Sequence, residues 1–315
     1  MSDQLMAKPK KKKYSREQIR ENFELVSIML PVLIMIFVFC YIPMYGVVIA
    51  FQKYAPGRPF LAFDGSTRWV GLKYFIDFVE GKYFGRLIGN TIKLSLYNLI
   101  FGFWVPIAFA LLLNEIKNLK ARKFFQTASY LPYFISTVIV AGIVISFIET
   151  SGLVNSVIEA LGGTRVALRT KAKAFPVIYT LTCIWKGFGF NSILYLSAIT
   201  AIDTALYESA KLDGAGRIRQ MWYITIPSIL PTISIMLIMA VGGLLSSNTD
   251  LILLLYSTAT YETADVIGTY VYRIGIEGGK FSQTAAIDLF ATVINFGLVF
   301  GANFLSNKLT NTGLW

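Results

Sequence analysis

The chain has 315 residues, of which 55% are hydrophobic and only 15% are charged. This composition excludes an ordinary soluble domain and is typical of a polytopic membrane protein. The absence of histidine and the presence of only two cysteines remove the commonest general base and exclude a zinc site. Cys40 and Cys183 lie in different apolar runs and are interpreted as packing residues, so no metal site is expected.

Residues 1–24 are predicted to form a basic cytoplasmic tail, because part of the net charge of +11 lies in the lysine cluster of residues 8–13. Beside a membrane span, such a cluster marks the cytoplasmic side or contacts anionic lipid, so nucleic acid is not an expected partner. The first apolar run, about residues 25–51, far exceeds the roughly 7–15 residues of a signal-peptide core and lacks a cleavage site. It is predicted to be a retained first helix.

Residues 52–87 mix charges with scattered aromatic residues and predict a partly helical, interfacial outer loop. Further apolar-rich runs of the length needed to cross a bilayer follow at about 88–113, 128–148, 175–199, 228–245 and 286–305. The sequence therefore predicts an all-α membrane protein with six transmembrane helices in a domain of residues 25–306. Both termini, including a short tail of residues 307–315, are expected on the cytoplasmic side.

A polar stretch, residues 201–226, separates two of these runs and is predicted to be a cytoplasmic loop of two short helices. Asp203 and Thr204 offer N-cap oxygens to a helix that ends before Gly214, a residue that accepts a left-handed conformation cheaply. A second helix is expected at residues 215–222, and Pro227 is expected to begin the next span.

The first helix of this loop is expected to expose Glu208, Lys211 and Asp213 to water and to offer a small docking face. That face consists of Leu206, Ser209 and Ala210. The alternative interpretation is an ordinary amphipathic loop on the membrane surface. The chain has no phosphate-binding loop and no dinucleotide-binding glycine motif, so any ATP hydrolysis is expected on another polypeptide.

The string from Tyr207 to Ala215, followed by Ile226 and Pro227, resembles the EAA loop of ATP-binding-cassette importer permeases. That loop has the pattern E-A-A-x-x-x-G, and here Ser209 replaces the first alanine. The resemblance implies that this coupling loop, residues 201–226, contacts an ATPase subunit. The residues expected to dock are Leu206, Tyr207, Glu208, Ser209, Ala210, Leu212, Asp213, Gly214 and Ala215.

Other segments resemble, in the same order, the oligosaccharide and polysaccharide permeases of the LplB type, within the MalF/MalG-like superfamily. These segments are residues 40–46, 69–75, 111–115, 129–136, 185–191 and 313–315. The resemblance implies a type I importer in a bacterial plasma membrane, with a second permease subunit and an extracytoplasmic sugar-binding protein. It also implies two ATPase subunits that bind ATP and magnesium, whereas this chain itself binds no cofactor.

Polar residues within apolar segments are candidates for the substrate pathway. Lys186 lies near the middle of its span, where an uncompensated charge costs about 2.5–3.5 kcal/mol on insertion scales. It therefore faces either the pathway or a structural pairing partner, and both interpretations remain open. The full candidate set is Trp185, Lys186, Asn191, Asn248 and Asp250.

The predicted function is a non-catalytic permease subunit of an ATP-driven carbohydrate importer. One alternative is an importer permease for another solute, such as amino acids or metals. Another is an ion-coupled secondary transporter, which would need ionisable residues at mid-membrane and usually an internal repeat. A membrane-embedded enzyme is disfavoured because the carboxylates are dispersed and histidine is absent.

Overall fold

The computed structural model describes residues 16–60, 67–310 and 313–314, and the regular elements of this part of the chain are all helices. The predicted all-α class is therefore confirmed. Most of the predicted basic tail, including its lysine cluster, lies outside the described residues. The first half of the chain comprises α1 (Arg16–Ile36), η1 (Phe37–Tyr41), α2 (Ile42–Met44), η2 (Tyr45–Phe51), α3 (Lys73–Val79), α4 (Phe84–Tyr97), η3 (Asn98–Gly102), α5 (Trp104–Glu115), α6 (Leu119–Phe134), α7 (Thr137–Ile148) and α8 (Leu153–Ala160).

The second half begins with two short 3-10 turns and the 26-residue helix α9, which contacts α4, α5, α6 and α12 and is the central helix of the bundle. These elements are η4 (Leu168–Thr170), η5 (Ala172–Ala174), α9 (Phe175–Thr200), α10 (Thr204–Leu212), α11 (Arg217–Gln220), η6 (Met221–Thr225), α12 (Ile226–Gly242), α13 (Thr249–Leu255), η7 (Thr258–Thr260), α14 (Tyr261–Ala264), α15 (Ile267–Val271), η8 (Tyr272–Glu277) and α16 (Phe281–Thr310).

Within the described residues, five helical stretches are long and apolar enough to cross a membrane, where the sequence predicted six. They are Arg20–Phe51, Phe84–Glu115, Thr137–Ala160, Arg217–Gly242 and Phe281–Lys308. The remaining predicted span, residues 175–199, is a continuous helix, α9, but it is not among the five. Its polar residues, Lys186 and Asn191 among them, lower its hydropathy, as expected of a helix that packs inside a bundle.

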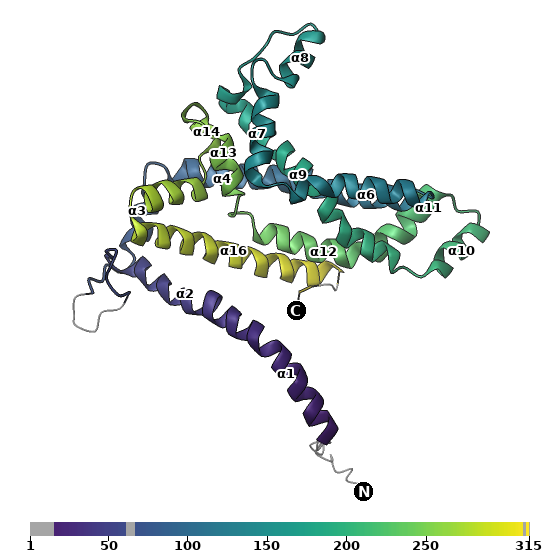
Figure 1. The fold of residues 1–315 in the computed structure, drawn as a ribbon, viewed down its shortest axis with the longest axis horizontal. Helices are drawn as coiled ribbons and strands as arrows, with labels where there is room; N and C mark the ends of the chain where they lie inside the picture. The colour runs from purple at the N-terminus through teal and green to yellow at the C-terminus, as the bar shows by residue number, and fades with distance from the viewer. Residues whose placement is uncertain (1–15, 61–66, 311–312, 315) are drawn as a thin grey trace.

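The predicted continuous span 128–148 is wrong, because α6 ends at Phe134 and α7 starts at Thr137. Ser136 begins α7 as its N-cap, with its Oγ accepting a hydrogen bond from the Ile139 amide at 3.3 Å. The chain changes direction at this break, so that α7 leaves the line of α6 steeply (Figure 1). Since α16 continues to Thr310, the first residues of the predicted C-terminal tail are helical.

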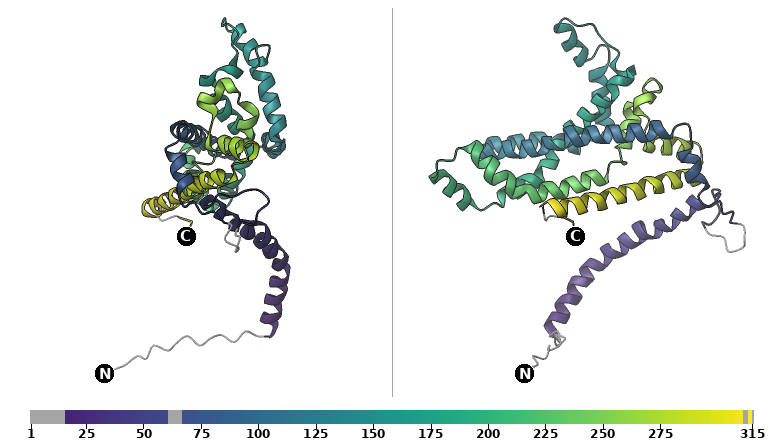
Figure 2. Two further views of the ribbon diagram at one scale, coloured as in Figure 1. Left: turned by 90° about the vertical axis from the view of Figure 1, so that its left-hand side faces the viewer. Right: turned by 180° about the vertical axis from the view of Figure 1, so that it is seen from behind.

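The interior of the bundle consists of three apolar clusters, each formed by helices that are distant in sequence. In contrast, α1 extends away from the other helices in every view (Figures 1 and 2). None of the most apolar window of Arg20–Phe51 is buried within the chain. A helix that is apolar on all sides and unburied is a membrane helix by composition and environment.

Candidate functional site

The coupling loop projects at one end of the molecule, with α10 at its tip (Figures 1 and 2). Asp203 begins this helix as predicted, because its Oδ1 accepts a hydrogen bond from the Ala205 amide at 2.9 Å. At the other end, Gly214 has a φ of +76°. The amides of Gly214 and Ala215 donate to the carbonyl oxygens of Lys211 and Ala210 at 3.0 and 2.8 Å, which is the Schellman pattern.

The nine predicted docking residues divide into an exposed and a half-buried group. The exposed residues are Leu206, Glu208, Ser209, Leu212, Asp213 and Gly214. Leu212 is the most exposed large apolar residue of the loop, at 90%. Tyr207, Ala210 and Ala215 are half-buried, so the predicted docking face of Leu206, Ser209 and Ala210 is only partly available to a partner.

The helix after Gly214 differs from the prediction in both its start and its continuity. It begins at Arg217, not Ala215, and runs without interruption through α11, η6 and α12 to Gly242. Pro227 therefore lies within a continuous helix and does not open it. The π-helical η6 precedes the proline and widens the helix, which accommodates the missing backbone donor and the bulk of the ring.

Among the described residues, two hydrogen bonds within the coupling loop and one ion pair to α5 hold the loop in place. The hydroxyl groups of Tyr207 and Thr225 share a hydrogen bond of 2.9 Å. The Gln220 side chain donates to the carbonyl oxygen of Ala215 at 2.7 Å, and an exposed ion pair of 3.7 Å joins Arg217 to Glu115 at the end of α5. These contacts lie beside a cleft of about 550 Å³ between α10, α11, η6 and the ends of α5 and α9.

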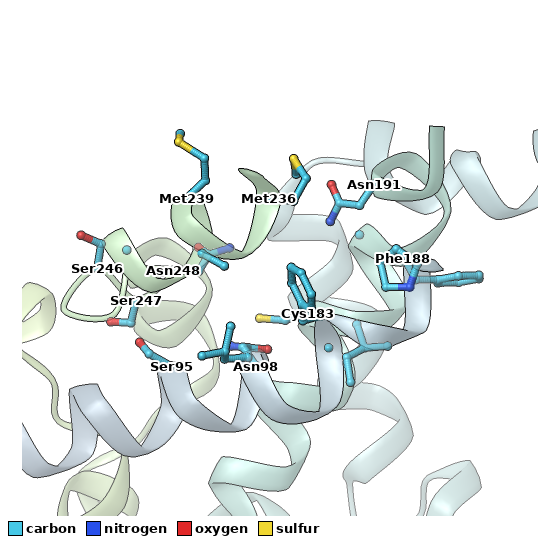
Figure 3. A pocket seen from close by; sticks show the side chains of 18 of the residues that line it. Ser95, Asn98, Cys183, Phe188, Asn191, Met236, Met239, Ser246, Ser247 and Asn248 are labelled. Carbon is cyan, nitrogen blue, oxygen red and sulfur yellow. The ribbon is translucent and has the colours of Figure 1, made fainter. Parts of the chain in front are cut away.

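A second cavity, of about 520 Å³, lies between α4, α5, α9 and α12. Two of the predicted pathway residues, Asn191 from α9 and Asn248 at the start of α13, line it together (Figure 3). Further lining residues that sequence reasoning missed are Ser95, Asn98, Ser246 and Ser247. Charged side chains are absent from the described lining. The Ser247 hydroxyl is buried and has no hydrogen-bond partner among the described residues.

The other three pathway candidates lie outside this cavity. Lys186 donates from Nζ to the Thr137 hydroxyl at 2.6 Å, at the break between α6 and α7. This contact favours the structural pairing interpretation of Lys186. Trp185 is 39% exposed, and Asp250 is an exposed residue in the first turn of α13.

A buried ionic cluster in the segment 243–280 was not predicted. The fully buried carboxylate of Asp265 pairs with Arg86 at 2.7 Å and with Arg273 at 3.0 Å, and Asn90 donates to the backbone carbonyl of Asp265 at 3.0 Å. Burial lowers the pKa of Arg273, but the hydrogen bond and charge of Asp265 outweigh burial, so this pKa is raised above its ordinary value. The cluster fastens the segment to the start of α4.

The sequence does contain a weak signal for the cavity and ionic-cluster residues that were not predicted. Asn90 and Asn98 lie eight residues apart in an apolar run, a spacing that places both on one face of a helix. Asp265 is a carboxylate directly flanked by Ala264 and Val266, which is the pattern of a buried charge with a partner elsewhere.

Comparison with known proteins covers nearly the whole chain. It is 39% identical over 312 residues, 99% of its length and 96% of the relative, to the polygalacturonan/rhamnogalacturonan transport system permease YteP of Bacillus subtilis. It is 37% identical to LplB of the same organism over 92% of this chain and 91% of the relative.

The fold is similar to that of a chain of a bacterial alginate ABC transporter crystallised in complex with an alginate pentasaccharide-bound periplasmic protein. This match has a TM-score of 0.84 and 40% identity, and it covers 95% of this chain and 99% of the other. Residues 107–311 match the model of the family described as binding-protein-dependent transport system inner membrane component. The chain therefore belongs to this family and is a multi-pass, non-catalytic permease component of an ABC transporter.

Proposed function

We propose that this chain is one of two permease subunits of an importer for polysaccharide fragments, with α9 as the sixth membrane helix. Both termini and the coupling loop lie in the cytoplasm of a bacterial cell. Two partner ATPase subunits bind ATP and magnesium and contact the loop, and an extracytoplasmic binding protein delivers the cargo. The observation that carries the proposal is the near full-length similarity to permeases named for polysaccharide transport.

The relatives also support a narrower cargo class. One is named for polygalacturonan and rhamnogalacturonan, and another belongs to a transporter of alginate, described as an acidic polysaccharide. These polymers contain uronate units, each of which carries one carboxylate and several hydroxyl groups. We propose fragments of such acidic polysaccharides as the cargo.

The cavity beside α9 supports the proposal chemically. Amide and hydroxyl groups of Asn98, Asn191 and Ser247 provide donors and acceptors for sugar hydroxyls. Phe188 lines the same cavity and supplies aromatic surface for the apolar faces of sugar rings. We assign Asn191 and Asn248 to the substrate pathway, whereas Lys186 is assigned to the structural contact with Thr137.

Reconstitution of the chain with its partner subunits and binding protein in proteoliposomes tests this function. Labelled oligogalacturonate is expected to accumulate only with ATP, and accumulation is expected to survive ionophores that abolish ion gradients. A neutral maltooligosaccharide of equal length is the control and should not accumulate. Uptake that is independent of ATP but sensitive to ionophores would overturn the proposal in favour of a secondary transporter.

The docking role has a separate test in the assembled complex. The variant Leu212→Cys places a thiol at the most exposed apolar position of the loop and is expected to cross-link to an ATPase subunit. Ala210→Cys is a matched variant on the same helix whose position is half-buried, so it should cross-link more slowly. Capture of the binding protein by either variant would place the loop on the wrong side of the membrane.

A further inference from the structure

The hydroxyl pair of Tyr207 and Thr225 is the one direct side-chain link between α10 and the long helix of α11, η6 and α12 among the described residues. Tyr207 is half-buried, whereas Thr225 is only 4% exposed. A hydrogen bond sheltered from water in this way is stronger than one on the surface. The link therefore ties the tip of the coupling loop to the base of the helix that follows it.

Thr225 lies at a place where this helix is easily bent. It is the last residue of the π-helical η6, in which the Ile226 amide donates to the carbonyl oxygen of Met221 instead of that of Trp222. Pro227 and Pro231 then remove two backbone donors from the first turns of α12. Helices bend preferentially at such π-turns and prolines, so a force applied at Thr225 acts where the backbone resists it least.

The same helix leads from this point to the substrate cavity. One wall of the cavity is formed by Met236, Met239 and Ala240 in α12 and by Gly243 directly after it, and Figure 3 shows the two methionines at its edge. A change in the direction of α12 at its base displaces this wall. The Tyr207–Thr225 hydrogen bond and the continuous helix that ends with α12 thus connect α10 to the cavity.

We propose that the Tyr207–Thr225 hydrogen bond positions α12 according to the position of α10, and so transmits movement of the coupling loop to the cavity. Both are positioning residues, because neither hydroxyl needs to touch cargo or nucleotide for this role. The inference rests on the proposed docking of the coupling loop to an ATPase. Without the hydrogen bond, α10 still docks, but α12 no longer follows it.

The test uses the complete complex in proteoliposomes, with Cys40 and Cys183 replaced by alanine. Met239→Cys provides a reporter thiol in the cavity wall, and its labelling by a membrane-impermeant maleimide is measured with and without ATP. The parent chain is expected to show a nucleotide-dependent labelling rate. Tyr207→Phe and Thr225→Val each remove one hydroxyl, and each is expected to reduce that dependence by about three- to tenfold, the range that one hydrogen bond supports.

Two features distinguish transmission from a general structural effect. The double variant is expected to be no worse than Thr225→Val alone, because Tyr207→Phe removes only the hydrogen bond that both hydroxyls share. Thr225→Val also removes a 3.5 Å contact to the carbonyl oxygen of Gln220, and Thr225→Ser should restore the parent behaviour. Tyr223→Phe is the matched control, since Tyr223 is 77% exposed on the same π-helix and its hydroxyl bonds none of the described residues. It should leave the nucleotide dependence unchanged.

The outcomes separate this inference from the docking proposal. Full nucleotide dependence in both single variants, or additive losses in the double variant, would overturn the inference alone, provided that Leu212→Cys still cross-links to the ATPase. An unresponsive reporter in the parent chain would also overturn it, since α12 would not move. Failure of Leu212→Cys to cross-link in the parent complex would overturn the docking proposal, and this inference with it.

Discussion

The coupling loop and the segment 243–280 both connect apolar helices, but they are stabilised in opposite ways. The coupling loop is largely exposed and is shaped by local contacts, namely the Asp203 cap and the left-handed Gly214. The segment 243–280 is held by long-range contacts, in which the buried Asp265 binds arginines 179 and 8 residues away. Local contacts therefore determine the shape of the exposed coupling loop, whereas contacts to distant residues fix the position of the whole segment 243–280.

This difference predicts that changes in the two regions damage different properties. Changes in the segment 243–280 should lower folding stability, because they leave buried charges without partners. Changes in the coupling loop should spare folding and impair transport, because the affected groups are exposed. Three predictions test this contrast, a fourth tests the cavity beside α9, and each is measured in the assembled complex.

Asp265→Ala should have the largest effect on stability. It leaves Arg86 and Arg273 partly buried without their carboxylate, so the free energy of unfolding should fall by about 3–5 kcal/mol. The thermal unfolding midpoint measures this loss. Glu159→Gln is the matched control, because it breaks an exposed carboxylate–arginine pair and should cost less than about 1 kcal/mol. Equal losses in the two variants would contradict the contrast.

Gly214→Val should have the largest effect on transport. A β-branched residue is strongly disfavoured at a φ of +76°, and no neighbouring atom would clash with its Cβ, so the effect acts through the backbone. The rate of ATP-dependent uptake should fall by about tenfold or more, while the unfolding midpoint changes little. Gly216→Ala is the control, because Gly216 has a φ of −67°. Normal uptake by Gly214→Val would count against the docking role.

Asn191→Asp should change the choice of cargo and neither folding nor docking. A carboxylate in the cavity lining would repel uronate groups, since like charges in contact are unfavourable. Uptake of labelled oligogalacturonate should fall by roughly tenfold, while binding-protein-stimulated ATP hydrolysis continues. The isosteric Asn191→Leu serves as the uncharged comparison and should cost less. A larger loss with leucine than with aspartate would argue against an acidic cargo.

Asp203→Ala should have the smallest effect, confined to α10. Loss of the N-cap hydrogen bond to Ala205 destabilises the start of the helix by about 1 kcal/mol. Hydrogen exchange of the α10 amides should become about fivefold faster, with the thermal midpoint unchanged. Asp203→Ser retains a capping oxygen and should exchange at the parent rate. Faster exchange across the segment 243–280 would show that the two regions are coupled.

The sequence predicted local features well and long-range features poorly. Asp203 and Gly214 act through atoms a few residues away, so their roles are visible in a short window. The break between α6 and α7 was missed because the run 128–148 is rich in apolar residues, and the Ser136 cap alone is a weak signal. Pro227 was placed at a helix start because proline is common there, but the π-turn before it lets the helix continue.

The candidate site shows the same division. Asn191 was selected as a polar residue within an apolar span and Asn248 as a polar residue at the outer end of the fifth span, and both line the cavity. Lys186 satisfied the same criterion, yet it bonds Thr137, and only the packing of α9 against its neighbours separates the two cases. Asn98 and Ser247 were missed because their significance depends on helices that are distant in sequence.

The uncharged lining that this chain gives to its cavity has a consequence for adaptation. Amide, hydroxyl and flexible thioether groups bind many kinds of sugar unit with similar affinity. A cavity lined by such groups therefore excludes few of the sugars that are delivered to it. Discrimination then belongs mainly to the protein that captures nutrients outside the cell. A bacterium that encounters a new plant or algal polymer would need to change the binding protein first, and it could keep the same permease.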